Sequence, residues 1–168
     1  KPAVKFHFVF IFLIPLLSLA RIPTKRIEVN PAIRNELNII LQNTDQLHSA
    51  CIEQDEGQIE LSTKNVIKSI KRAAHNSARV QIEITHLVKV LNAAKDKLEL
   101  SQNFSGQKRL DSLKEAFKDL VQIAQVYKLD HYNIFFCSKD KSLWLQKSSA
   151  PKNPINPEKF GKCGRLVQ

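Results

Sequence analysis

Apolar side chains between residues 31 and 128 recur at alternating gaps of three and four positions, which is the spacing of one face of an α-helix. Asn30-Pro31 predicts where the first helix starts, because an Asn side chain can accept a hydrogen bond from the first turn and Pro suits that turn. Asp55-Glu56-Gly57 is expected to end this helix. Its inward face is predicted to consist of Ile33, Leu37, Ile40, Thr44, Leu47 and Cys51.

Three further amphipathic segments follow, over about residues 58–78, 80–100 and 107–128. Their apolar stripes are Val66, Ile67, Ile70 and Ala74; Ile84, Leu87, Leu91, Ala94 and Leu98; and Leu110, Leu113, Phe117, Leu120, Ala124 and Tyr127. Four helices of roughly 20 residues with short connections are typical of an antiparallel bundle. The helical part therefore predicts a mainly α fold, an antiparallel four-helix bundle.

The periodicity changes after residue 128. Residues 132–136 and 142–146 read as two short strands joined by a polar turn, and the Ser-, Pro- and Asn-rich stretch beyond Gln146 reads as loop to the end. An isolated hairpin is marginal in water, so we expect its aromatic residues to pack on the end of the bundle, with Trp144 substantially buried. The predicted domain thus ends in a small C-terminal β-hairpin and loop cap.

Residues 1–20 have the features of a signal peptide. Lys1 and Lys5 provide a basic start, residues 6–19 are almost unbroken apolar sequence, and Ser18-Leu19-Ala20 fits a cleavage site. An uncleaved membrane anchor is the alternative. Residues 21–30 are interpreted as a linker and residues 31–168 as the helical-bundle domain, whose cap is residues 129–168. This organisation predicts a periplasmic or secreted protein.

The formal net charge of +10 permits loose contact with nucleic acid or anionic lipid. However, the basic residues interleave with acidic ones, no run of five basic residues occurs, and no aromatic residues interleave with them for base stacking. We therefore expect no nucleic-acid partner, and no membrane partner after signal cleavage. The sequence has no serine-nucleophile elbow, zinc-protease helix, phosphate loop or dinucleotide fingerprint, so we also expect that it is not an enzyme.

The cysteines carry the candidate chemistry. Cys137 and Cys163 bracket Trp144, the single tryptophan, and a proline-rich loop. In an oxidising compartment two such cysteines usually form a disulfide. Metal-bound thiolates and free thiols are the two alternatives, and monovalent copper is the ion that would accept so few soft ligands.

Three weaker metal candidates lie elsewhere. His48 and Cys51 are three residues apart on one side of the first predicted helix and could chelate together. Cys51 also falls in the apolar register, where a free Cys packs as a small hydrophobic residue. His131 precedes Cys137 by six residues, which is about 20 Å if that stretch is extended, so the two cannot share an ion without an intervening turn.

The C-terminal pattern resembles a bacterial periplasmic domain family of unknown function, whose members occur alone and at the C-terminus of copper and heavy-metal efflux membrane-fusion proteins. The resemblance covers about residues 32–167. Its motif residues here are Cys137, Trp144, Leu145, Asn153, Pro154, Gly161, Cys163, Gly164 and Val167. Where the family has Pro-Met after the first cysteine, this chain has Ser138-Lys139, and it contains no methionine. A thioether ligand for copper is therefore absent.

The resemblance implies a non-enzymatic accessory or binding domain associated with copper or heavy-metal handling. Its implied ligand is monovalent copper, and its implied partner is a heavy-metal efflux component or another periplasmic protein. The alternative is a disulfide-stapled structural or protein-interaction module with no metal role.

Overall fold

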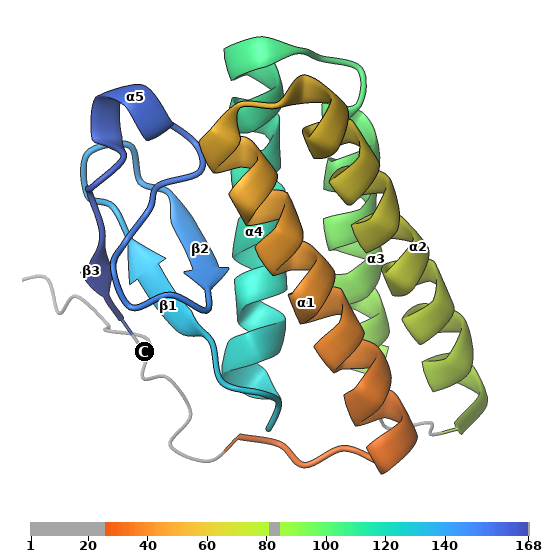
Figure 1. Cartoon of the computed structure of the whole chain (residues 1–168). Helices are drawn as coiled ribbons and strands as arrows, with labels where there is room; N and C mark the ends of the chain where they lie inside the picture. The colour runs from red at the N-terminus through yellow and green to blue at the C-terminus, as the bar shows by residue number, and fades with distance from the viewer. Residues whose placement is uncertain (1–25, 81–84, 168) are drawn as a thin grey trace, which may run out of the picture.

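The computed structural model describes residues 26–80 and 85–167, so the predicted signal peptide, residues 21–25 of the predicted linker, and Ile84 lie outside the described residues. The chain is mostly helical and carries a small antiparallel sheet. The four long helices are α1 (Pro31–Glu53), α2 (Glu56–Val80), α3 (Thr85–Ser101) and α4 (Gly106–Val126). Successive helices lie side by side and run in opposite directions (Figure 1).

The start of α1 is where the sequence predicts it. The Ala32 N–H donates to Asn30 Oδ1 at 2.8 Å, and Pro31 opens the first turn. The second helix, predicted over about residues 58–78, begins two residues earlier, at Glu56. Asp55 is the reason: its Oδ1 accepts a hydrogen bond from the Gln58 N–H at 3.0 Å, which satisfies a first-turn donor.

The predicted apolar stripes form the core. Leu87, Leu91, Ala94 and Leu98 of α3 are fully buried, as are Leu37, Ile40 and Leu47 of α1. Thr44, the polar member of the α1 stripe, is also buried and donates its hydroxyl to the Ile40 carbonyl at 2.8 Å. None of the helices within the described ranges is long and apolar enough to cross a membrane.

The predicted hairpin is confirmed as β1 (Asn133–Phe136) and β2 (Leu143–Gln146). The prediction of a loop from there to the end is wrong in two places. A short helix, α5 (Pro157–Phe160), follows the prolines, and β3 (Arg165–Leu166) pairs antiparallel with β1. The sheet order is β2-β1-β3, so the end of the chain returns to the first strand of the hairpin.

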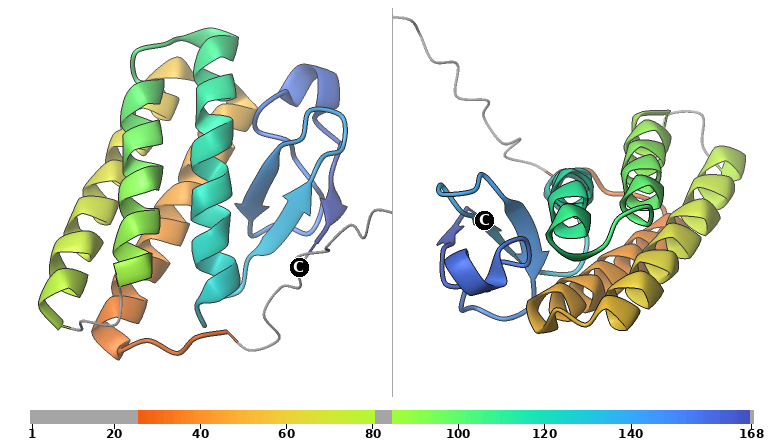
Figure 2. Two further views of the ribbon diagram at one scale, coloured as in Figure 1. Left: turned by 180° about the vertical axis from the view of Figure 1, so that it is seen from behind. Right: turned by 90° about the horizontal axis from the view of Figure 1, so that it is seen from above.

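The sheet lies along the sides of α1 and α4 and not on the end of the helices, which corrects our expectation (Figure 2). Successive strand residues point to opposite faces. Leu145 packs with Leu41 of α1 and Val121 of α4, whereas the neighbouring Trp144 lies on the opposite face of the sheet. Both residues are fully buried, because the helices cover one face and the C-terminal loop covers the other.

Candidate functional site

The two cap cysteines form a disulfide. Cys137 directly follows β1, Cys163 directly precedes Gly164 and β3, and their sulfur atoms are 2.04 Å apart. Cys137 is fully buried and Cys163 is partly buried. The disulfide therefore decides between the three states that the sequence left open. Because a thiolate is the form that ligates metal, this pair offers no metal ligand while it is oxidised.

Trp144 is the centre of the cap. Its ring is fully buried, and its Nε1–H donates to Gln146 Oε1 at 2.8 Å. Gly164 lies directly against the ring, since a Cβ at this position would be 2.9 Å from Trp144 Cη2 and 2.7 Å from Pro151 Cβ. The second motif glycine, Gly161, is equally constrained, because a Cβ there would be 2.3 Å from the Pro157 carbonyl oxygen.

Asn153 organises the loop between β2 and α5. It is fully buried, and its Oδ1 accepts hydrogen bonds from the backbone N–H groups of Ile155 (2.8 Å) and Asn156 (3.3 Å). Its own backbone N–H donates to the Gly161 carbonyl at 2.9 Å. With buried Pro154 beside it, Asn153 fixes the loop that covers Trp144. The motif residues are therefore packing and hydrogen-bonding elements of the cap.

Asp140 is a residue of the cap that sequence reasoning missed. Its carboxylate accepts hydrogen bonds from the Ser142 backbone N–H and hydroxyl and from the side-chain amides of Asn153 and Asn156. Burial acts to raise the pKa of Asp140, but these hydrogen bonds outweigh it and hold the pKa below its usual range. The Asp140-x-Ser142 turn pattern was the available signal.

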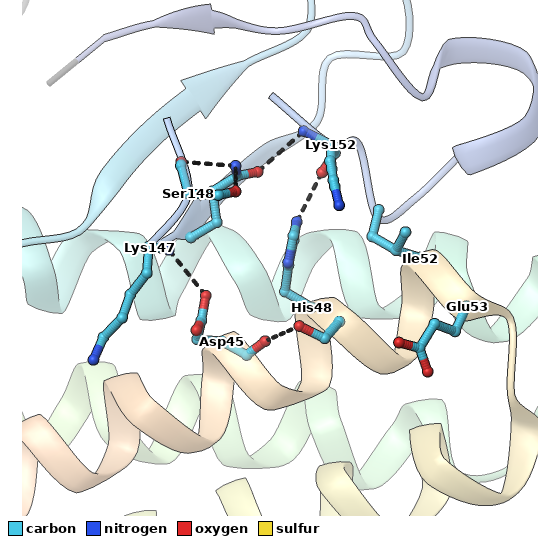
Figure 3. Close-up of a pocket in the computed structure, with 9 residues that line it drawn as sticks. Asp45, His48, Ile52, Glu53, Lys147, Ser148 and Lys152 are labelled. Carbon is cyan, nitrogen blue, oxygen red and sulfur yellow. Dashed lines mark hydrogen bonds between the residues drawn. The ribbon is translucent and has the colours of Figure 1, made fainter. Parts of the chain in front are cut away.

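Two hollows lie along the seam where the C-terminal half of α1 meets the cap. The first, of about 310 Å³, is shown in Figure 3. Its lining residues are Asp45, His48, Ser49, Ile52, Glu53, Gln146, Lys147, Ser148 and Lys152. His48 Nε2 lies 2.7 Å from the Lys152 carbonyl oxygen, and the Lys147 N–H donates to Asp45 Oδ1 at 3.0 Å. These contacts attach the cap loop to α1.

The second hollow, which we call the α1–cap groove, has a volume of about 630 Å³. It shares Ile52 and Lys152 with the first hollow. Its lining residues are Ile52, Gln54, Ala150, Pro151, Lys152, Pro157, Glu158, Gly161 and Lys162. The lining combines aliphatic residues and prolines with the charged side chains of Lys152, Glu158 and Lys162.

The weaker metal candidates are not arranged as ligands. Burial lowers the pKa of His48, which favours the neutral ring that bonds to Lys152. Burial raises the pKa of the Cys51 thiol, so this side chain is an inert core thiol. His131 is exposed at the start of the cap. No cluster of three His, Cys, Asp or Glu side chains able to hold a metal ion occurs within residues 26–80 and 85–167.

These donors do not fit monovalent copper, which needs accessible soft ligands. The association with copper or heavy-metal handling stays a prediction that rests on the family resemblance. Comparison of the chain with family models, with curated proteins and with solved structures found no match.

Proposed function

We propose that this protein is a non-enzymatic, disulfide-stapled protein-interaction module, in which a four-helix bundle supports a C-terminal cap that docks a partner protein. The observation that carries the proposal is the Cys137–Cys163 disulfide, which ties the end of β1 to the loop that covers Trp144. A bond at this place makes the cap a rigid surface. A rigid surface loses little conformational freedom on binding, and that loss is a main cost of association.

The two cysteines of the cap and the carboxylate of Asp140 are engaged within the cap itself. The two cysteines are bonded to each other, and the Asp140 carboxylate accepts hydrogen bonds from neighbouring residues. Neither arrangement supplies a free nucleophile or general base. The outward-facing feature of the cap is the α1–cap groove, and a groove of this kind favours binding over catalysis.

The setting of the proposal is the periplasm or the exterior of the cell. A disulfide is typical of proteins in an oxidising compartment, and the predicted signal peptide agrees with export. The resemblance to the domain family of efflux membrane-fusion proteins adds a candidate class of partner. We therefore propose a heavy-metal efflux component or another periplasmic protein as the partner.

Site-specific photocrosslinking tests this proposal. A photoreactive residue replaces Ala150, which is exposed and lines the groove; the matched control replaces Ala93, which is exposed on α3. We expect position 150 to capture a discrete protein in the periplasm and position 93 not to capture it. The Cys163→Ser variant should lose the capture while keeping its helix content. Equal capture from both positions, or capture that survives Cys163→Ser unchanged, would contradict the proposal.

A further inference from the structure

The α1–cap groove has a chemistry that specifies its occupant. Resting on the proposed function, we infer that this groove binds an acidic segment of a partner protein. An apolar side chain of that segment enters between Ile52, Pro151 and Pro157, and its carboxylates lie next to Lys152 and Lys162.

The apolar part of the groove comes from three separate segments. Ile52 projects from the last turn of α1, Ala150 and Pro151 come from the loop after β2, and Pro157 opens α5. Figure 3 shows Ile52 on α1 facing the loop that carries Lys152. Aliphatic side chains and prolines around a recess favour burial of an aliphatic or aromatic side chain of the ligand.

The walls of the groove are fixed before any ligand binds. The Lys152 N–H donates to Gln146 Oε1 at 3.1 Å, and the Lys152 carbonyl bonds to His48 at 2.7 Å. Across the loop, the Asn153 N–H donates to the Gly161 carbonyl at 2.9 Å. The side chains of Lys152 and Lys162 are exposed, and the backbone of Lys152 is held by two hydrogen bonds.

The charge of the cap selects an acidic ligand. Residues 129–168 contain seven basic side chains and three acidic ones. The ion pairs of the described chain all join residues of the helical part or its flanks, such as Lys128 with Glu28, and none involves Lys152 or Lys162. Glu158, the one acidic residue that lines the groove, receives a hydrogen bond from Gln54 at 3.4 Å.

Other cations of the cap lie over aromatic rings. Lys159 is 5.2 Å from the centre of the Phe160 ring, and Arg165 is 5.6 Å from that of Phe136. These contacts leave the positive charge without a counter-ion, so the cap keeps a positive potential around the groove. Charge complementarity therefore favours an acidic partner.

The recessed, aliphatic form of the groove distinguishes a peptide from other anions. A bilayer presents a flat surface that meets exposed cations in general, with no preference for a hollow. Single-stranded nucleic acid binds through aromatic faces on which bases stack, and the lining of the groove has none. An acidic peptide with an apolar side chain matches both the recess and its two lysines.

Selection from a random-peptide display library on the oxidised full chain tests the inference. We expect the enriched peptides to combine Asp or Glu with Leu, Ile, Val or Phe. The affinity of the best peptide can be measured by fluorescence anisotropy. It should fall at least about tenfold in Lys152→Glu/Lys162→Glu, because this variant reverses two charges at the rim of the groove. The control Lys68→Glu/Lys139→Glu, with the same net charge, should lose less than about twofold, because both residues are exposed outside the groove.

A charge swap provides a second readout. A basic version of the best peptide, with Lys in place of its acidic residues, should bind the Lys152→Glu/Lys162→Glu variant better than it binds the wild-type protein. Enriched peptides without acidic residues, or equal losses in the two double variants, would overturn the inference. The inference would also be overturned if no peptide were enriched and the protein instead bound phosphatidylglycerol vesicles, with that binding lost in Lys152→Glu/Lys162→Glu.

The two proposals fail in different ways. Suppose that no acidic peptide is enriched, but the photoreactive residue at position 150 still captures a protein and Cys163→Ser abolishes that capture. The protein is then an interaction module with a different ligand. If the crosslinking experiment also fails, the proposed function itself is wrong.

Discussion

Gly164 lies so close to Trp144 that no side chain fits between them: a Cβ at Gly164 would be 2.9 Å from Cη2 of the indole ring. The same Cβ would be 2.7 Å from Pro151 Cβ. Gly164→Ala should therefore overpack the cap and reduce the free energy of unfolding by about 1–3 kcal/mol. Urea denaturation followed by tryptophan fluorescence measures this loss directly, since Trp144 is the single tryptophan.

Gly57 supplies the matched control. It lies in the first turn of α2, and a Cβ there would meet only Asp55 Oδ1 at an ordinary 3.4 Å. Gly57→Ala should leave stability unchanged or raise it by about 0.5–1 kcal/mol, because Ala loses less backbone entropy in a helix. Similar losses in the two variants would show that Gly164 is not constrained by Trp144.

Cys163→Ser should destabilise the protein without unfolding its helices. The disulfide closes a loop with a sequence separation of 26 residues, for which chain entropy alone corresponds to about 3–4 kcal/mol. Urea denaturation should show this loss, whereas the far-ultraviolet circular dichroism of the folded variant should match that of the wild type. A reductant should destabilise the wild type by a similar amount and leave the variant unchanged. A variant as stable as the wild type would contradict the structural role of the bond.

Asn153→Ala should cost about 2–4 kcal/mol, because it leaves the buried N–H of Ile155 and the partly buried N–H of Asn156 without their acceptor and removes a donor to Asp140. Asn153→Asp keeps the acceptor but places a carboxylate beside that of Asp140. Its stability should therefore fall as the pH rises from about 4 to about 7, because the new carboxylate must ionise beside the carboxylate of Asp140. A pH-independent loss in Asn153→Asp would argue against the contact between the two side chains.

His48 should make stability depend on pH. Burial lowers the pKa of His48 in the folded protein below the ordinary value near 6.5, with Asp45 and Lys152 as its charged neighbours. The unfolded chain then binds the proton more readily, so the contribution is complete above about pH 6.5 and decreases as the pH falls toward the folded pKa. Unfolding free energies measured between about pH 7.5 and pH 5 should show this decrease.

His48→Gln is the matching control. Its amide can still donate to the Lys152 carbonyl but does not titrate, so the slope in this window should become shallower. The exposed histidines His75, His86 and His131 are retained in this variant. If the slope were the same in both proteins, His48 would not be the group responsible.

The helices and the hairpin could be predicted because their signals are local. The three-and-four spacing of Leu87, Leu91, Ala94 and Leu98 defines a helical face by itself, and all four residues are buried. The short elements α5 and β3 have no such signal. β3 is two residues long and exists through its pairing with β1, where Arg165 lies opposite Phe136.

The position of the cap also depends on contacts that no local pattern records. Trp144 and Leu145 are adjacent and both fully buried, so alternation could not indicate which face of the sheet meets the helices. His48 and Lys152 are separated by 104 residues, and their hydrogen bond forms only once the loop crosses α1. The cysteine pair could be recognised in the sequence, but the groove beside it required the structure.

Whether Cys137 and Cys163 are bonded to each other in protein taken from a bacterial periplasm is the decisive question for the proposed function. Native mass spectrometry of the full-length gene product, exported to a bacterial periplasm and purified without reductant, reports this state. We predict the mass of a chain cleaved after Ala20, two hydrogens lighter than the same chain after reduction. We also predict that this protein carries no metal and takes up no copper when monovalent copper is added. A protein with free thiols that carries stoichiometric copper, or an oxidised protein that binds copper tightly, would contradict the account.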